Sequence, residues 1–353
     1  MTQPEPATQR ALHLTAPMLI GAAMTAAGCA SLDADQRHAA APAVREAAPA
    51  HPAPTRTGYA AVPGARIYYQ IHGDLDARKP PLLILHGGYM SADAMAPMIR
   101  SFAARRTVIA TDARGHGRNG DVPGPITYDL LADDAGAVLK ELNVAKADVL
   151  GYSMGANTAL LMAMRHADRV GKLILLSGTY RRDGWYPEVL KGLESVKPQT
   201  FAGTPLEAEY RRLSPTPNAF PSLVDKLKAL DMRPQAWPED AVRAIAGKTM
   251  VVIGDADGVE LEHAVKLFKL RGGGDFEAVA KGFIDKPPRA RLAILPATSH
   301  TGIMTQAGLI SDLATPFLED ETPPIAPGFF PEATTVQANQ EATSKPPQKD
   351  PKP

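Results

Sequence analysis

Cysteine is nearly absent from this chain, which has a single one, Cys29, in 353 residues. One cysteine cannot form an intramolecular disulfide, and it excludes a metal site built from several thiolates. An excess of charge of either sign is also absent, because 38 Lys and Arg balance 38 Asp and Glu. Without a basic surplus, we expect no nucleic acid or other polyanion as a partner. An internal repeat is lacking too.

The composition is that of a globular protein, with 44% hydrophobic and 22% charged residues. The length allows one large domain with tails. Residues 29–57 are rich in Ala and Pro, which predicts an extended tether. Residues 319–353 are Pro-rich as well and predict a disordered tail. The folded domain is therefore expected over residues 58–318.

The first 28 residues have the pattern of a signal peptide, with a polar start followed by an apolar run. His13 and Pro17 interrupt this run, which disfavours a permanent membrane span. The run ends in Ala26-Ala-Gly-Cys29, which resembles the lipobox of bacterial lipoproteins. The match is imperfect, because the first position of a lipobox is usually Leu and here is Ala26. We expect export to the cell envelope and a lipid anchor on Cys29 that holds the protein on a membrane. Ordinary signal cleavage nearby is the alternative.

Short apolar runs alternate with helical patterns through the expected domain. Residues 65–71 alternate at period two, as in an early antiparallel strand. The apolar runs are typical of strands buried on both faces of a parallel sheet, and they lie at 81–85, 107–110, 147–150, 172–176, 249–253 and 291–295. The helical patterns lie around 92–104, 129–142, 154–165, 262–270 and 301–317. This order predicts a mostly parallel sheet covered by helices on both sides.

The segment Gly151-Tyr-Ser-Met-Gly155 places one serine between two glycines, directly after a strand and before a helix. So sharp a turn strains the backbone of its central residue and leaves no room for side chains at the two glycines. Ser153 is then exposed at a helix N-terminus, where N–H groups favour developing negative charge. This pattern predicts that Ser153 is a nucleophile, whereas the same five residues alone would also fit an ordinary loop.

A second glycine-rich turn, His86-Gly-Gly-Tyr-Met90, follows the run 81–85. Such a turn can aim its N–H groups at one point, as a tetrahedral oxyanion requires. We expect an oxyanion hole formed by the N–H of Met154 and that of Gly88, with Tyr89 as the alternative to Gly88. A simple turn at the end of a strand would have the same composition.

A serine hydroxyl needs a base to take its proton and a third group to orient that base. Asp255 and Asp257 follow the strand expected at 249–253, and His300 follows the next strand. The chain order of Ser, Asp and His is that of enzymes with a nucleophile on such a strand-to-helix turn. Either aspartate is a candidate for the acid.

Taken together, these motifs resemble the α/β-hydrolase superfamily over about residues 58–318. The resemblance rests on His86-Gly-Gly, Asp112-Ala-Arg-Gly-His-Gly117, Gly151-Tyr-Ser-Met-Gly155, Gly254-Asp-Ala-Asp257 and the late His300. It implies an α/β-hydrolase fold with a mostly parallel eight-stranded sheet and a small helical cap at about 180–246. It also implies Ser153 as nucleophile, His300 as general base and Asp257 as the acid, with Asp255 as the fallback.

The resemblance gives other residues supporting positions. It implies that His86 and His116 pack loops and take no part in the chemistry. His263, beside Glu262 on a helix, is expected at the surface or behind the site. In and near the cap, the aromatic residues Tyr89, Trp185, Tyr186, Phe220 and Trp237 are candidates for lining a substrate pocket. Alternatively, these residues form the core of the cap.

The sequence therefore predicts a serine hydrolase that cleaves a carboxylic ester of a small or medium acyl group through an acyl-enzyme. A serine nucleophile argues against relatives that use a carboxylate, such as haloalkane dehalogenases and epoxide hydrolases. Lactonase, thioesterase, C–C hydrolase and cofactor-free haloperoxidase chemistry stay open. A tethered envelope protein that binds a ligand without turnover is the rival from another class. No metal-ligand spacing is present, and we expect neither a metal nor a cofactor.

Overall fold

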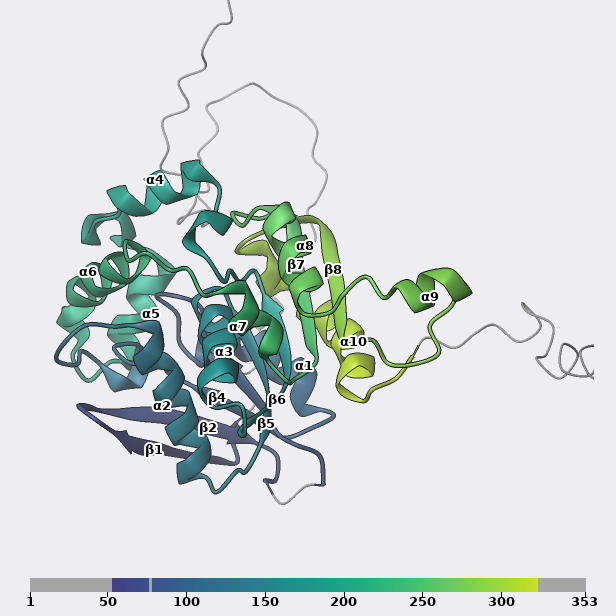
Figure 1. Ribbon diagram of the computed structural model, residues 1–353. Helices are drawn as coiled ribbons and strands as arrows, with labels where there is room; N and C mark the ends of the chain where they lie inside the picture. Colours follow the sequence, from purple (N-terminus) through teal and green to yellow (C-terminus); the bar gives the residue numbers. More distant parts are fainter. Residues whose placement is uncertain (1–52, 76–77, 323–353) are drawn as a thin grey trace, which may run out of the picture.

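The computed structural model describes residues 53–75 and 78–322, whose strands form one sheet in the order β1-β2-β4-β3-β5-β6-β7-β8 (Figure 1). The strands are β1 (Arg56–Val62), β2 (Ala65–His72), β3 (Leu82–Leu85), β4 (Val108–Thr111), β5 (Ala147–Tyr152), β6 (Val170–Leu176), β7 (Thr249–Ala256) and β8 (Ala290–Ser299). Strands β3 to β8 pair in parallel, whereas β1 pairs antiparallel with β2, and β2 with β4. The mostly parallel eight-stranded sheet expected from the sequence is confirmed.

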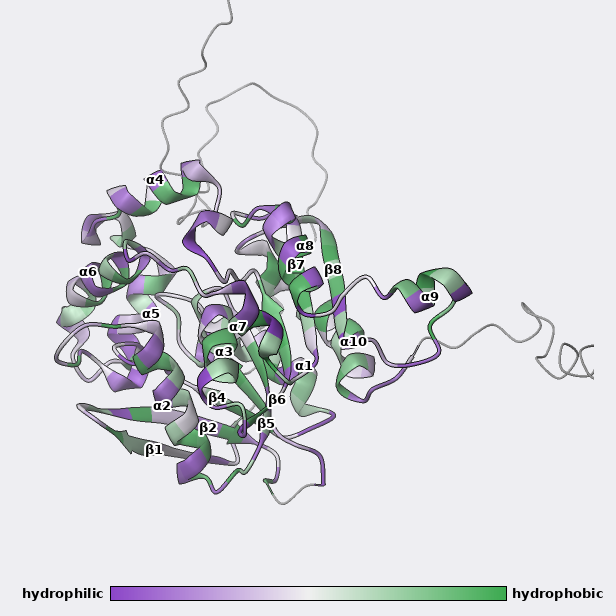
Figure 2. Ribbon diagram, in the orientation of Figure 1, coloured by the Kyte–Doolittle hydropathy of each residue, from purple (hydrophilic) through white to green (hydrophobic). Residues whose placement is uncertain are grey.

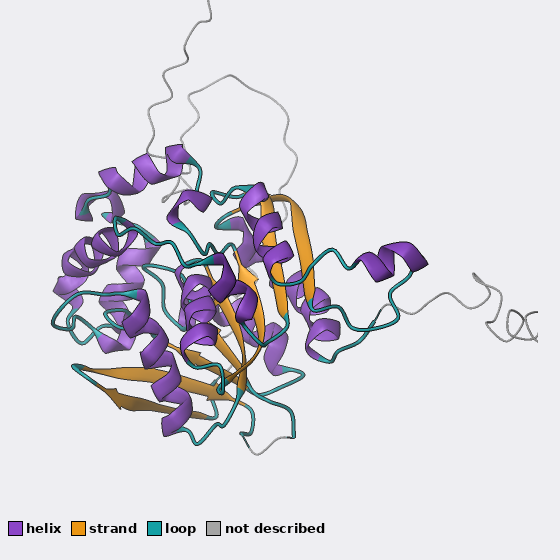
Figure 3. Ribbon diagram, in the orientation of Figure 1, coloured by secondary structure: helices purple, strands orange, loops and turns teal. Residues whose placement is uncertain are grey.

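Helices cover both faces of the sheet (Figure 3), because its central strands are apolar on both faces. On one face lie α1 (Ala96–Ala103), preceded by the 3-10 turn η1 (Asp93–Met95), and α10 (Ala307–Leu318), preceded by η6 (Gly302–Gln306). The other face is covered by α2 (Tyr128–Glu141), α3 (Met154–Arg165), α7 (Glu239–Ala244) and α8 (Leu261–Leu270). Figure 2 shows hydrophobic residues along the central strands of the sheet and a mixture of hydrophobic and hydrophilic residues along the helices that flank it.

The cap lies between β6 and β7 and stands over the carboxyl ends of the central strands (Figure 1). Its elements are η3 (Arg182–Gly184), α4 (Pro187–Ser195), η4 (Pro198–Phe201), α5 (Pro205–Leu213), η5 (Pro217–Ala219) and α6 (Phe220–Asp231). The apolar cluster of the cap includes Phe201, Phe220 and Leu227, and it also takes in Met154 from the start of α3. Helix α7 follows in the chain, but its buried Val242 belongs to the core beside α3. The cap therefore packs on the sheet domain through a shared apolar cluster.

Two segments near the end of the domain differ from expectation. Between α8 and β8 the chain forms α9 (Phe276–Lys281), which projects beside β8 and exposes Phe276 (Figure 1). Beyond α10, Asp320 pairs with Lys172 at 2.8 Å and with Lys248 at 2.7 Å. Residues 319–321, expected as the start of the tail, are therefore held against the domain.

The expected N-terminal features lie almost entirely outside the described residues. The signal peptide over residues 1–28, Cys29, most of the tether at 29–57 and the tail from 323 onward are among them. Strand β1 begins at Arg56, within the last two residues of the expected tether. In the part of the chain that the structure describes, no helix is both long and apolar enough to cross a bilayer.

Candidate active site

The turn between β5 and α3 has the strained geometry that its glycines predict. Ser153 adopts φ 53° and ψ −117°, a conformation that residues with a side chain rarely take. A Cβ added at Gly151 would lie 2.2 Å from the carbonyl oxygen of Gly155, and one added at Gly155 would lie 2.2 Å from that of Leu85. Both positions therefore require glycine, and the close approach holds Ser153 at the tip of the turn.

The structure brings Ser153, Asp257 and His300 together from the ends of three strands. The Nε2 atom of His300 lies 3.0 Å from the Ser153 hydroxyl oxygen, and its Nδ1 atom lies 2.8 Å from Asp257 Oδ1. Asp257 is buried and also accepts hydrogen bonds from the Ser177 hydroxyl, at 2.5 Å, and from the N–H of Val259, at 3.0 Å. This is the geometry of a nucleophile, a base and the acid that orients the base.

Asp255 has another place in the structure. Its carboxylate accepts the main-chain N–H groups of Ala297 and Thr298, at 2.9 and 3.0 Å. These residues lie in β8 where the pairing of β7 with β8 shifts register, and Ala297 has a positive φ of 50°. Asp255 thus accepts the main-chain N–H groups of an irregular part of β8, whereas Asp257 contacts His300.

The hydrogen bonds determine where the protons lie. Burial would raise the pKa of the Asp257 carboxyl, but hydrogen bonds from His300, Ser177 and the main chain of Val259 outweigh it and hold the pKa below its usual value. An ionised Asp257 can only accept, so Nδ1 of His300 carries a proton. When the ring carries this one proton, Nε2 presents a lone pair to the Ser153 hydroxyl.

Two aromatic residues position His300. The Tyr152 hydroxyl donates to the main-chain oxygen of His300 at 2.9 Å, and the two rings are 5.3 Å apart. The Trp185 ring meets the imidazole edge-on at 5.1 Å. Sequence reasoning missed Tyr152 as well as Ser177, the partner of Asp257. The available signals were that Tyr152 directly precedes Ser153 and that Ser177 directly follows β6.

In the turn after β3, the N–H of Tyr89 is hydrogen-bonded, whereas that of Gly88 has no partner among the described residues. Tyr89 has φ 64°, and its N–H donates to Nε2 of His116 at 3.2 Å. The N–H groups of Gly88 and Met154 have no hydrogen-bond partner within residues 53–75 and 78–322. These two donors are therefore free to meet an oxyanion, which removes Tyr89 as the alternative.

Two buried histidines, His86 and His116, make hydrogen bonds that fix the conformation of this turn. Nδ1 of His86 donates to the Gly87 carbonyl at 2.7 Å, and its Nε2 accepts the Ala113 N–H at 2.9 Å. Nδ1 of His116 lies 2.9 Å from the Arg114 carbonyl. Burial lowers the pKa of His86 to about 4 and that of His116 to about 3, so both rings are neutral at pH 7. Each ring can therefore accept the N–H that it faces.

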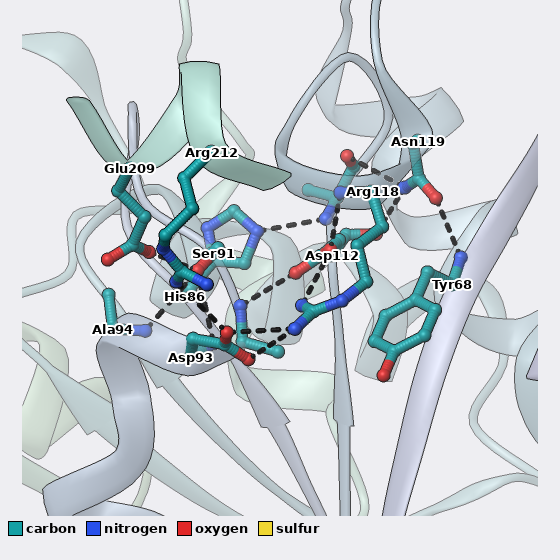
Figure 4. A network of polar contacts seen from close by, with 12 residues as sticks. Tyr68, His86, Ser91, Asp93, Ala94, Asp112, Arg118, Asn119, Glu209 and Arg212 are labelled. Atoms are coloured by element: carbon teal, nitrogen blue, oxygen red, sulfur yellow. Dashed lines mark hydrogen bonds and ion pairs between the residues drawn. The ribbon is translucent and has the colours of Figure 1, made fainter. Parts of the chain in front are cut away.

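Charged side chains tie the cap to the same turn, as Figure 4 shows. Arg118 binds both carboxylate oxygens of Asp93, at 2.8 and 2.9 Å. Arg212 of α5 reaches the same carboxylate at 3.2 Å, and Glu209 of α5 accepts a hydrogen bond from the Ser91 hydroxyl. Because Ser91 and Asp93 follow the His86–Met90 turn directly, α5 and this turn are held as one unit.

The expected pocket residues lie at different depths. The Tyr89 ring packs against Phe201 at 4.4 Å, and its hydroxyl is buried without a partner among the described residues. Trp185 lies beside the catalytic imidazole, as given above. Tyr186 is 40% exposed at the start of α4, whereas Phe220 is buried within the cap cluster. Of the expected pocket residues, Trp185 therefore lies beside the catalytic imidazole, Tyr89 packs against the cap cluster, and Phe220 belongs to the core of the cap.

His263 is not at the surface, which corrects one of the two positions expected for it. Its ring stacks on Tyr180 at 4.6 Å and accepts the Tyr180 N–H at 3.3 Å. Burial lowers its pKa to about 4. A Cβ at Gly184 would lie 2.5 Å from this ring, so the segment that leads into the cap packs directly on it. Among the described residues, no group of three or more His, Cys, Asp and Glu could hold a metal ion.

Comparison with known proteins assigns the fold to a family. The family profile described as the alpha/beta hydrolase fold matches residues 80–269. This chain belongs to that family. A thermophilic esterase from Thermogutta terrifontis is similar in structure, with a TM-score of 0.56 and 20% identity over 75% of this chain and 98% of the esterase. At that identity the likeness supports the fold alone.

The relatives found by sequence are named for several different hydrolytic activities. A candidate carbamate hydrolase, RutD, of Caulobacter segnis is 36% identical over 119 residues, which are 33% of this chain and 45% of RutD. The aligned segment thus spans less than half of that relative. A 2-hydroxymuconate semialdehyde hydrolase of a Pseudomonas species is 30% identical over 209 residues, or 51% of this chain and 71% of the relative. The family is shared, while the bond that each protein cleaves differs by name.

Proposed function

We propose that the protein is a serine hydrolase that cleaves a carboxylic ester through an acyl-enzyme. The observation that carries the proposal is the continuous hydrogen-bonded line from Ser153 through His300 to Asp257, with Ser153 held on a strained turn. A structural serine needs neither a strained backbone nor an imidazole nitrogen at hydrogen-bond distance. The same line argues against the rival role of a ligand-binding protein without turnover.

Each residue has a defined role in the proposed reaction. His300 Nε2 takes the Ser153 proton as the serine oxygen attacks the substrate carbonyl, and ionised Asp257 stabilises the imidazolium that forms. The N–H groups of Gly88 and Met154 donate to the oxyanion. His300 then protonates the departing alcohol, which leaves the acyl group on Ser153. Water, deprotonated by His300, attacks this acyl-enzyme and restores the free serine.

The choice of an ester among the bonds open to such a site rests on chemistry. The line of Ser153, His300 and Asp257 is sufficient for acyl transfer, and the two oxyanion donors suit any carbonyl. The relatives' names include a carbamate hydrolase, an esterase/lipase and a hydrolase of a C–C bond, so these remain the competing bonds. Thioesters and lactones are carbonyl substrates of the same class.

Hydrolysis of p-nitrophenyl esters from acetyl to decanoyl tests the proposal, with Ser153→Ala as the matched control. Turnover that depends on Ser153 and has a chain-length optimum supports an ester hydrolase and measures the acyl site. A fluorophosphonate probe that labels wild type but not Ser153→Ala reports a competent nucleophile independently. Labelling without ester turnover would redirect the search to lactones, thioesters, carbamates and C–C substrates. Folded protein that the probe does not label would favour the binding role.

We also propose that the enzyme acts in the cell envelope, anchored by a lipid on Cys29. The proposal is supported by the signal-peptide pattern of residues 1–28 and by the position of the one cysteine directly after Ala26-Ala-Gly. Mass spectrometry of the mature N-terminus tests it. An acylated Cys29 is expected, and an unmodified terminus at a nearby residue would indicate ordinary cleavage.

A further inference from the structure

The short segment 177–179 leads from β6 toward the cap, and its first residue contacts the proposed acid. The Ser177 hydroxyl donates to Asp257 Oδ2 at 2.5 Å, and its main-chain N–H donates to the Val252 carbonyl of β7 at 2.9 Å. Ser177 is buried and has φ 52°, in the left-handed region that residues with a side chain rarely adopt. Such a conformation costs free energy, so the surrounding structure must hold it in place.

The side chain of Asn157, near the start of α3, holds this segment. Its Oδ1 atom accepts the main-chain N–H of Thr179 at 2.7 Å. Because a main-chain N–H can only donate, this bond requires the amide oxygen, and not its nitrogen, to face Thr179. Asn157 is 2% exposed, and a Cβ added at Gly178 would lie 2.6 Å from Cβ of Ala156. The segment therefore lies directly on α3 and is bonded to it.

These bonds form a second connection between the candidate nucleophile and the acid. The main-chain N–H of Asn157 donates to the Ser153 carbonyl at 3.1 Å, so Asn157 is attached to the turn that holds the serine. From Asn157 the connection continues through segment 177–179 to Asp257. His300 bonds to Ser153 at 3.0 Å and to Asp257 at 2.8 Å. If Asp257 moved, the imidazole could not keep both bonds at these lengths.

The same amide also meets the chain that leaves the cap. The Nδ2 atom of Asn157 lies 3.4 Å from Gln235 Oε1, and Gln235 Nε2 donates to the Thr179 carbonyl at 3.1 Å. The main-chain N–H of Arg182 donates to the Gln235 carbonyl at 2.8 Å, which pairs the two connections of the cap. Replacing Gln235 would therefore loosen the base of the cap but leave the bond from the Thr179 N–H to Asn157.

We propose that Asn157 is a positioning residue, which fixes segment 177–179 so that the Ser177 hydroxyl holds Asp257 in the orientation that His300 requires. The inference rests on the proposed function and deepens it, because both Asn157 and Ser177 act through the acid. A misplacement of about 1 Å at a catalytic group can lower the rate about 10²-fold. The loss is expected in kcat, because Asp257 acts in the chemical step, and KM should change little.

Two replacements of similar shape separate the hydrogen bond of Asn157 from its packing. Asn157→Leu keeps the branched side chain but removes the acceptor, whereas Asn157→Asp keeps an oxygen toward the Thr179 N–H. We expect kcat on the preferred p-nitrophenyl ester to fall about ten- to a hundredfold in Asn157→Leu. In Asn157→Asp it should stay within about threefold, because the bond is retained. Gln235→Ala is the matched control, and its kcat should stay close to that of wild type.

A double variant tests whether the two residues act through one another. Ser177→Ala removes the donor to Asp257 and should lower kcat about as much as Asn157→Leu. The loss in Asn157→Leu/Ser177→Ala should not exceed that of the more affected single variant, because residues of one hydrogen-bond network are not additive. Melting temperatures of all variants would show which losses come from unfolding.

The proton on Nδ1 of His300 gives a readout that needs neither an ester nor turnover. An imidazole N–H that donates to a carboxylate forms a short, charge-assisted bond, and its proton resonates at low field in NMR. The absence of this resonance from His300→Gln would assign it. We expect it in wild type, Asn157→Asp and Gln235→Ala. In Asn157→Leu and Ser177→Ala it should move upfield or disappear.

Ser177→Ala removes a single oxygen atom, so it tests the inference even if Asn157→Leu does not fold. An unchanged resonance and kcat in Ser177→Ala would overturn the inference. Losses that multiply in the double variant, or equal losses in Gln235→Ala and Asn157→Leu, would overturn it as well. A resonance that depends on Asn157 and Ser177 in a protein that hydrolyses no ester would sustain the positioning role and overturn only the ester assignment.

Discussion

The Nε2 atom of His116 accepts the main-chain N–H of Tyr89 at 3.2 Å, and this bond determines which donors face the candidate nucleophile. It engages the Tyr89 N–H and holds that residue at φ 64°. The neighbouring Gly88 N–H has no partner among the described residues and stays available as a donor. A buried neutral histidine that touches no substrate thus shapes the proposed oxyanion hole.

Replacing His116 should reduce catalysis more than substrate binding. In His116→Ala the Tyr89 N–H loses its acceptor, and we expect kcat to fall about tenfold, part of the 10²–10³ that full loss of an oxyanion donor produces. The KM should change little. Steady-state kinetics on the preferred p-nitrophenyl ester would measure both. His116→Gln, whose amide oxygen can accept the same bond, should retain more activity, and His166→Ala at the end of α3 is the control. A raised KM with unchanged kcat would contradict this role.

The two aspartates after β7 should differ sharply when each is replaced. Asp257→Asn removes the ionised partner of His300 and favours the wrong tautomer, so kcat should fall about 10⁴-fold. Asp255→Asn disturbs only the N–H groups of Ala297 and Thr298 and should lose far less. Kinetics of the two variants beside their melting temperatures would separate the effects. Equal losses of kcat at equal stability would show that Asp257 is not the orienting acid.

Acid should destabilise the fold through its buried histidines. His86 has a pKa of about 4 in the folded protein against 6.5 as its ordinary value, so between these values the unfolded chain binds the extra proton. Stability due to neutral His86 is therefore complete above pH 6.5 and falls by about 3 kcal/mol as the pH drops to 4. Urea unfolding at intervals from pH 7 to pH 4.5 would measure it. His86→Gln should flatten the slope, and an unchanged slope would exclude His86 as its source.

Two glycine replacements should act in opposite directions. Gly155→Ala places a methyl group 2.2 Å from the Leu85 carbonyl oxygen and should abolish the turn that holds Ser153. Gly192→Ala, in the middle of α4, meets nothing within 4 Å and should stabilise the protein by about 0.5–1 kcal/mol. Fluorophosphonate labelling and melting temperature would test the pair. Normal labelling of Gly155→Ala would mean that the turn can rearrange.

Local patterns predicted much of the fold because each core strand and helix carries its own periodic signal. Helix α3 begins at Met154 and ends at Arg165, as expected from the pattern at 154–165. Strand β1 was missed because its apolar residues do not alternate regularly, and its pairing with β2 makes it a strand. In the cap, α4 has no fully buried residue, so its apolar side chains Val189, Leu190 and Leu193 do not reach the core.

The site was harder to predict wherever distant segments decide an outcome. The order of residues alone left both Asp255 and Asp257 as candidates, and only the family resemblance favoured Asp257. In the structure, the register shift between β7 and β8 separates their roles. His263 was expected at the surface or behind the site because Glu262 precedes it on the helix, yet Gly184 and Tyr180 approach it from a segment some eighty residues earlier.

Met154 supplies a proposed oxyanion donor with its main chain and packs its side chain into the apolar cluster of the cap. The cap is therefore not a module that could be exchanged like a loop. Removing the cap would take away Phe201 and Leu227. The Met154 side chain, on the helix that follows Ser153, would then face water. A lineage that acquires a new cap must rebuild this contact as well, so substrate range and the integrity of the catalytic turn are bound to change together.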